Sequence, residues 1–145
     1  MPITQKFSLI CDEVRQEING KFLILGMYTP DLAVVSIPFV APTLTFLSWL
    51  ESDRPGQFQF RLKLSHLESG ATLAEGMGGV GFAKAGTGMV PVRLVGITFS
   101  SPGPYTFSIQ FDGQEALITH FSVLLVPQPQ QAGPFTGQAG QGRLG

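Results

Sequence analysis

Charged side chains are scarce in this sequence. They make up 13% of its 145 residues, about half the usual share for a soluble domain, and the formal net charge is −1. Few charges and a net charge near zero weaken repulsion between copies and favour association. The composition therefore predicts a protein of an assembly, although an ordinary monomer with few charges would share it. Because the sequence carries no basic stripe, we expect no nucleic-acid partner.

Cysteine and long hydrophobic runs are also lacking. A single cysteine, Cys11, excludes a disulfide within the chain. The first residues lack the basic flank and apolar core of a signal peptide, so we expect folding in a reducing cytoplasm. Pro38 and Pro42 interrupt the most apolar stretch, residues 32–50. We therefore expect no membrane span.

Helical periodicity is missing as well, and the residues present are those of strands and turns. The chain has 12 Phe, 18 Gly and 11 Pro beside many Val, Ile, Leu and Thr. Two hairpins stand out: residues 6–28 turn at Asn19-Gly20, and residues 105–126 turn at Asp112-Gly113. Both turn sequences tolerate positive φ.

Two further segments predict how the strands are buried. Residues 57–64 alternate Phe or Leu with Gln, Arg or Lys, which is typical of a strand with one wet face. Residues 43–51 place Leu44 and Phe46 on one side but Leu47 and Trp49 on the other. This strand is expected to be buried on both faces or covered by a partner.

Together these patterns predict an all-β, antiparallel two-sheet β-sandwich of about eight strands over residues 1–126, immunoglobulin-like or jelly-roll-like. Residues 127–145, rich in Pro, Gln and Gly, are expected to form an extended C-terminal arm without a core of its own. Fixing such an arm costs roughly 20 to 40 kcal/mol of backbone entropy. An ordered arm would need a neighbouring chain to hold it.

The glycine-rich residues 76–88 allow two interpretations. One is a flexible apolar loop or bulged strand that packs on a partner; the other is a broken strand whose side chains fold back into the sandwich. The formal Gly-x-Gly-x-x-Gly match at 76–81 is attributed to chance, because no helix follows to hold a pyrophosphate. The candidate partner-binding residues of the chain are Met77, Val80, Phe82, Met89, Phe135 and Leu144.

Groups for catalysis or metal binding are few. His66 and His120 lie in separate predicted strands and outside known catalytic motifs, so no catalytic residue is predicted. Cys11 precedes Asp12 and Glu13, whose charges raise a thiol pKa, and it is predicted to be a small core-facing residue. One cysteine and two separated histidines supply too few metal ligands, and neither a cofactor nor a metal is predicted.

Several segments carry a resemblance to an uncharacterised bacterial and phage-associated domain family. They are residues 11–17, 19–21, 23–28, 39–42 and 103–107. The first two segments read Cys-Asp-Glu-Val-Arg-Gln-Glu and Asn-Gly-Lys. The likeness covers residues 5–126. It implies a β-sandwich of unknown function and supplies no site residues.

The leading functional hypothesis is a non-enzymatic structural protein of a larger, oligomeric assembly, most concretely a bacteriophage virion component such as a capsid-decorating or tail protein. Its partners would be other protein chains, copies of itself or neighbours in the particle, and it would assemble in the host cytoplasm. The alternative is a bacterial cytoplasmic module that binds a peptide or small ligand along a sheet edge. A hydrolase would require His66 or His120 beside a serine and a carboxylate.

Overall fold

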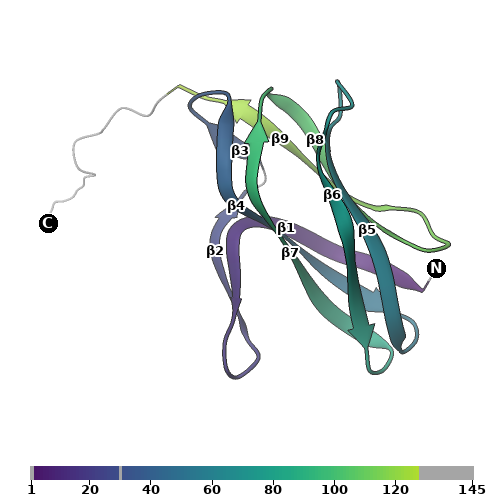
Figure 1. Cartoon of the computed structure of the whole chain (residues 1–145). Helices are drawn as coiled ribbons and strands as arrows, with labels where there is room; N and C mark the ends of the chain where they lie inside the picture. Colours follow the sequence, from purple (N-terminus) through teal and green to yellow (C-terminus); the bar gives the residue numbers. More distant parts are fainter. Residues whose placement is uncertain (1, 30, 128–145) are drawn as a thin grey trace, which may run out of the picture.

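The computed structural model describes residues 2–29 and 31–127 as two packed β-sheets (Figure 1). Within these residues, no helix is long and apolar enough to cross a membrane. The nine strands are close to the eight or so expected. They are β1 (Ile3–Gln16), β2 (Phe22–Tyr28), β3 (Leu32–Val34), β4 (Phe39–Ser52), β5 (Gly56–His66), β6 (Thr72–Phe82), β7 (Gly86–Phe99), β8 (Gly103–Phe111) and β9 (Leu117–Leu125).

The strand order is that of an immunoglobulin-like sandwich. Sheet A has the order β2-β1-β4-β7, and sheet B has the order β3-β9-β8-β5-β6. Strands β4 and β7 pair as strands B and E do, while β5, β8 and β9 pair as C, F and G do. The order therefore decides between the two sandwich types expected from the sequence. The short β3 lies at the edge of sheet B.

Aromatic rings fill the space between the sheets. Phe46 of sheet A stacks on Phe107 of sheet B with ring centroids 4.0 Å apart, and Phe121 lies 5.7 Å from Phe46. Phe99 and Tyr105 are both fully buried beside them. Large rings that bridge two sheets supply much of the apolar burial that stabilises a sandwich.

Tyr105 also fastens the corner that leads from β7 into β8. Its hydroxyl donates a 2.6 Å hydrogen bond to the carbonyl oxygen of Ser101. This is the tyrosine corner of immunoglobulin-like folds, in which a tyrosine at the start of strand F bonds the backbone a few residues upstream. Burial raises the pKa of this hydroxyl, so the phenol keeps its proton and remains a donor.

The glycine-rich run is strand, not loop. Residues 76–82 pair with β5 along their whole length, and only 83–85 separate β6 from β7. The loop interpretation is therefore wrong, because these residues form a regular ladder with β5 at the edge of sheet B. Gly78 makes room for Phe60: a Cβ on Gly78 would lie 2.6 Å from Cζ and 2.8 Å from Cε1 of that ring.

Replacing Tyr105 with Phe should lower the free energy of unfolding by about 1–2 kcal/mol, because the Ser101 carbonyl loses its donor. Chemical denaturation measures this change. Tyr28→Phe is the control, since Tyr28 donates to Asp12 in an exposed bond and should cost less. Equal losses for the two variants would contradict the corner's role.

Replacing Gly78 with Ala should cost about 1–3 kcal/mol, because the buried Phe60 ring must shift to admit the methyl group. Gly76→Ala is the matched control on the same strand. A Cβ there meets nothing within 4 Å, so stability should stay within about 0.5 kcal/mol or rise. Thermal melting of both variants separates strain from loss of glycine as such.

Candidate interaction surface

The register of the strands decides which side chains of sheet A point away from sheet B. Phe46 points into the core, and Ile10 is its partner on β1. Because side chains alternate along a strand, Leu9 and Cys11 point outward, as do their partners Leu47 and Thr45 on β4. The same alternation runs through the pairings of β2 and β7.

We call this outward side of sheet A the A face. It carries a large apolar side chain from every strand of the sheet. They are Phe7 and Leu9 from β1, Leu23, Leu25 and Met27 from β2, Leu47 and Trp49 from β4, and Met89, Pro91 and Val95 from β7. Six of these are among the exposed large hydrophobic residues: Phe7, Leu23, Leu25, Met27, Trp49 and Val95. The expectation that residues 43–51 are buried on both faces holds for Leu47, whereas Trp49 is 36% exposed on the outer side, and cover by a partner stays a prediction.

Two side chains of the A face are already fully buried without belonging to the core between the sheets. Leu47 and Cys11 both have 0% exposure, yet neither is part of the cluster that joins the two sheets. Cys11 is therefore buried as expected but not core-facing, because its partner Thr45 also points outward. Burial, and then the charge of Asp12, raises the thiol pKa, as the sequence predicted.

An aromatic pair lies within the A face. The rings of Phe7 and Trp49, partners on β1 and β4, have centroids 5.0 Å apart at an angle of 58°. Such tilted pairs hold each other in place and supply large apolar area at low cost in side-chain entropy. They are therefore suited to a contact surface.

Charged side chains of both signs lie among the apolar residues of the A face, with Glu13 opposite Leu25 and Arg15 opposite Leu23. Lys6 lies 3.4 Å from Glu51, and Arg15 donates a 2.6 Å hydrogen bond to Glu13. That bond lowers the pKa of the Glu13 carboxyl. Arg93 also projects from β7 on this side, as the partner of Thr45. Exposed pairs of this kind add little stability but shape the field around a surface.

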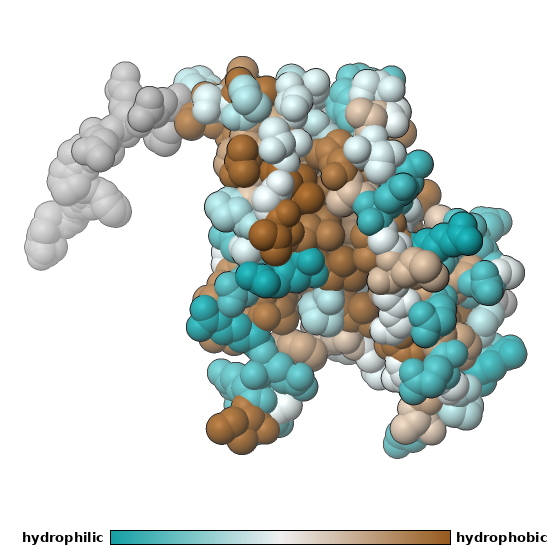
Figure 2. Space-filling view, viewed as in Figure 1, coloured by the Kyte–Doolittle hydropathy of each residue, from teal (hydrophilic) through white to brown (hydrophobic). Residues whose placement is uncertain are grey.

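The outer side of sheet B, which we call the B face, is of the opposite kind. Its central strands β5 and β8 present Gln57, Gln59, Arg61, Lys63, Ser65, Thr106, Ser108 and Gln110. Hydrophobic side chains in Figure 2 gather at the centre of the molecule and at the end of the β1–β2 hairpin, while the side where Figure 1 draws sheet B is mostly hydrophilic. The prediction of a wet face for residues 57–64 is confirmed.

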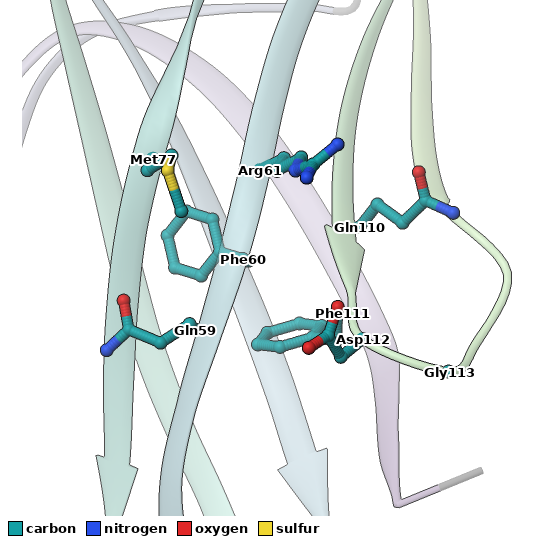
Figure 3. A pocket seen from close by; sticks show the side chains of 8 residues that line it. All are labelled: Gln59, Phe60, Arg61, Met77, Gln110, Phe111, Asp112 and Gly113. Carbon is teal, nitrogen blue, oxygen red and sulfur yellow. The ribbon is translucent and has the colours of Figure 1, made fainter.

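A shallow depression of about 320 Å³ lies on the B face. Figure 3 shows side chains from three neighbouring strands around it, with Gln59 and Arg61 from β5, Met77 from β6 and Gln110 from β8. The lining is mainly amide and charged groups over the edges of the rings of Phe60 and Phe111. Ligand pockets are usually deeper and more apolar.

His66 holds the turn between β5 and β6. Its Nε2–H donates to the carbonyl of Pro102 over 3.1 Å, so Nδ1 is the acceptor for the Ser69 hydroxyl at 2.7 Å. The Ser69 oxygen in turn accepts the N–H of Ala71. The histidine thus has a serine partner, but a main-chain carbonyl rather than a carboxylate orients it. We interpret these hydrogen bonds as stabilising the turn between β5 and β6.

The remaining polar candidates are dispersed. His120 is exposed on the B face. Among the described residues, no group of three histidines, cysteines or carboxylates comes close enough to hold a metal ion. Asp12 instead accepts a hydrogen bond from Tyr28, whose pKa rises to about 12 through burial and then through this bond and the Asp12 charge.

The structure distributes the predicted partner-binding residues over different surfaces. Phe82 is buried, and Val80 packs against the core. Met77 is 72% exposed on the B face, whereas Met89 lies on the A face beside Trp49. Of the four candidates that the structure describes, Met89 alone therefore belongs to the apolar surface. Phe135 and Leu144 lie outside the described residues.

Sequence reasoning missed most of the A face. Its missed members include Phe7, Leu23, Leu25, Met27 and Val95. A signal was present in β2, where apolar residues follow one another without a polar alternate, as in a strand covered on both sides. The β1–β2 pairing that places the residues of β2 on the same side of the sheet as Trp49 lay beyond the local pattern.

The candidate site is thus the A face, the apolar outer side of one sheet of an immunoglobulin-like sandwich. The chain belongs to the family described as "Family of unknown function (DUF6941)", whose model matches residues 6–124. This confirms the expected membership of an uncharacterised family. None of the curated proteins matches the chain.

Solved structures show only remote likeness. A β-glucosidase of Erythrobacter marinus matches with 17% identity and a TM-score of 0.44, over 63% of this chain and 14% of that one. The β-glucosidase of Listeria innocua in complex with glucose matches with 9% identity and a TM-score of 0.47, over 87% of this chain and 16% of that one. An alkylpurine DNA glycosylase of Pseudomonas fluorescens matches with 11% identity and a TM-score of 0.46, over 66% of this chain and 28% of that one. The chain spans less than a third of each, and no functional argument follows.

Replacing His66 with Ala should lower the free energy of unfolding by about 2–3 kcal/mol, because the buried ring packs against Tyr105 and also bonds Ser69 and Pro102. His120→Ala removes an exposed ring and should change it by less than about 0.5 kcal/mol. Urea denaturation of the two variants measures the difference. Similar values would mean that the β5–β6 turn does not depend on the imidazole.

Proposed function

We propose that this chain is a non-enzymatic interaction protein that joins a larger assembly by burying its A face against another protein chain. The observation that carries the proposal is the contrast between the two outer faces. Sheet A has apolar side chains on both sides, while the outer side of sheet B is polar along its central strands β5 and β8. The exposed apolar side chains of that outer side, Met77, Ile118 and Leu124, lie on the flanking strands β6 and β9.

The size and continuity of the A face support a contact role. Monomeric soluble proteins rarely expose a continuous apolar patch larger than a few hundred Å². Here six large apolar side chains, each at least 36% exposed, come from four adjacent strands. Single exposed hydrophobic residues need no explanation, but a full sheet of them raises the free energy of the uncovered state.

The chemistry of the described residues supports the non-enzymatic part. Both ring nitrogens of His66 are engaged in a turn, and Cys11 is buried with a raised pKa that disfavours the reactive thiolate. The depression on the B face brings together Gln59, Arg61 and Gln110, a set without a nucleophile and base in contact. These residues suit solvent contact or weak binding.

The finer identity, a capsid-decorating or tail protein of a bacteriophage, stays a prediction. It combines the proposed interaction role with the resemblance to a bacterial and phage-associated domain family. Virions are assemblies in which small sandwich proteins bind to other protein chains. Mass spectrometry of purified particles tests it directly. Absence of the chain from the particles would refute the virion role and leave the alternative of a bacterial binding module.

The assembly role predicts that a charge on the A face releases the chain from its partners. In extracts of the native host, the tagged wild-type chain should co-fractionate on gel filtration far above its own 15.6 kDa. Leu25→Lys should move most of it to the free position, because burying an unpaired lysine in the contact costs several kcal/mol. The expected shift is detected by immunoblotting of the fractions.

Leu124→Lys is the matched control, because Leu124 is similarly exposed but points outward from sheet B. It should leave the elution unchanged. A wild-type chain that elutes alone, or two variants that elute alike, would overturn the proposed function. Equal thermal stability of the purified variants confirms that the substitution changed the contact and not the fold.

A further inference from the structure

We infer that the occupant of the A face is a second copy of this chain, packed sheet on sheet in a two-fold symmetric dimer. The inference rests on the proposed function and names the partner at the same surface. Three properties of the face carry it: its area, its charge balance and the polarity of the opposite face.

The area suffices for a stable pair. Strands β4 and β7 run side by side for about 30 Å, from Thr87 to Val95 on β7, whereas β2 pairs with β1 only from Ile10 to Gln16. At roughly 3.3 Å per residue and about 4.8 Å per strand, the paired lengths of the four strands sum to an outline of about 600 Å² per copy, so two copies would bury on the order of 1,200 Å². Specific interfaces begin at about 1,000 Å².

The charges of the A face suit a surface that meets itself. In a two-fold contact the same patch lies on both sides, so a face of one sign would repel its copy. The A face instead carries Lys6, Arg15 and Arg93 together with Glu13 and Glu51. Positive and negative groups of one copy can meet opposite charges of the other. The net charge of −1 on the whole chain adds little repulsion.

The two faces together favour a closed pair. Sheets pack about 10 Å apart when their side chains interdigitate, as sheets A and B already do. Two A faces in contact give the layer order B-A-A-B, in which each copy uses its apolar face completely. The mainly polar B faces then meet solvent, so this sheet-on-sheet contact closes at two copies. A head-to-tail contact would leave one apolar face open.

Trp49 reports on this contact without any label. It is the only tryptophan of the chain, and it lies on the A face beside Phe7 at 36% exposure. On dilution of the purified full-length chain, its emission should move to longer wavelength and its quenching by acrylamide should increase. Sedimentation velocity should show the mass falling from twice 15.6 kDa to 15.6 kDa over the same concentrations.

A matched pair of variants ties the dimer to the A face. Met27 and Met77 are both exposed, at 53% and 72%, on the A face and the B face respectively. Met27→Glu should raise the dissociation constant of the dimer about 100-fold or more, because it buries an unpaired carboxylate. Met77→Glu should leave it unchanged. Circular dichroism and thermal melting of both variants verify the fold.

A purified chain that remains monomeric at millimolar concentration, with Trp49 emission independent of dilution, would overturn the inference. So would a dimer that Met27→Glu leaves intact. If the isolated chain is monomeric but Leu25→Lys still releases it from its assembly in host extracts, the partner is a different protein and the proposed function stands. If Leu25→Lys has no effect there either, the proposed function fails as well.

Discussion

Strand β4 is the element on which the rest of the structure depends. It pairs with β1 on one edge and β7 on the other, and its side chains alternate between two apolar environments. Phe46 and Leu44 face the rings of sheet B, while Leu47 and Trp49 face away from them. An antiparallel strand with one wet face would show polar residues at the second set. Because Leu47 and Trp49 belong to the second set, sheet A has apolar side chains on both sides, and the contacts inferred above start from this one constraint.

Much of the fold could be predicted from local sequence. The hairpins at Asn19-Gly20 and Asp112-Gly113 form because each glycine takes a positive φ, 85° and 75°, that other residues resist. The alternation in residues 57–64 depends only on period two and correctly assigned a wet face. The β6 strand was harder to recognise, because glycine lowers strand propensity and its pairing with β5 is a property of the tertiary structure.

The interaction surface was predictable only in part, for a related reason. Apolar residues on both sides of 43–51 indicated that β4 has apolar side chains on its outer side as well, since this information lies within one strand. Whether Leu25 and Met27 join Trp49 on the same side depends on the registers of β1 with β2 and β4. A shift of one residue would have placed them on the opposite face. Sequence proximity also grouped Met77 with Met89, although the turn at 83–85 takes them to different sheets.

Because Gly78 and Phe60 are in contact, the size of the residue at either position limits the size that the other can have. The phenylalanine ring fills the volume that a side chain on β6 would otherwise take, and it lies against Phe111 at 5.5 Å between centroids. A smaller residue at position 60 would free space for a side chain at 78, and restoring the ring would demand glycine again. Across related chains, the residues at these two positions should therefore change together, large with small, even where the rest of the strand pair varies freely.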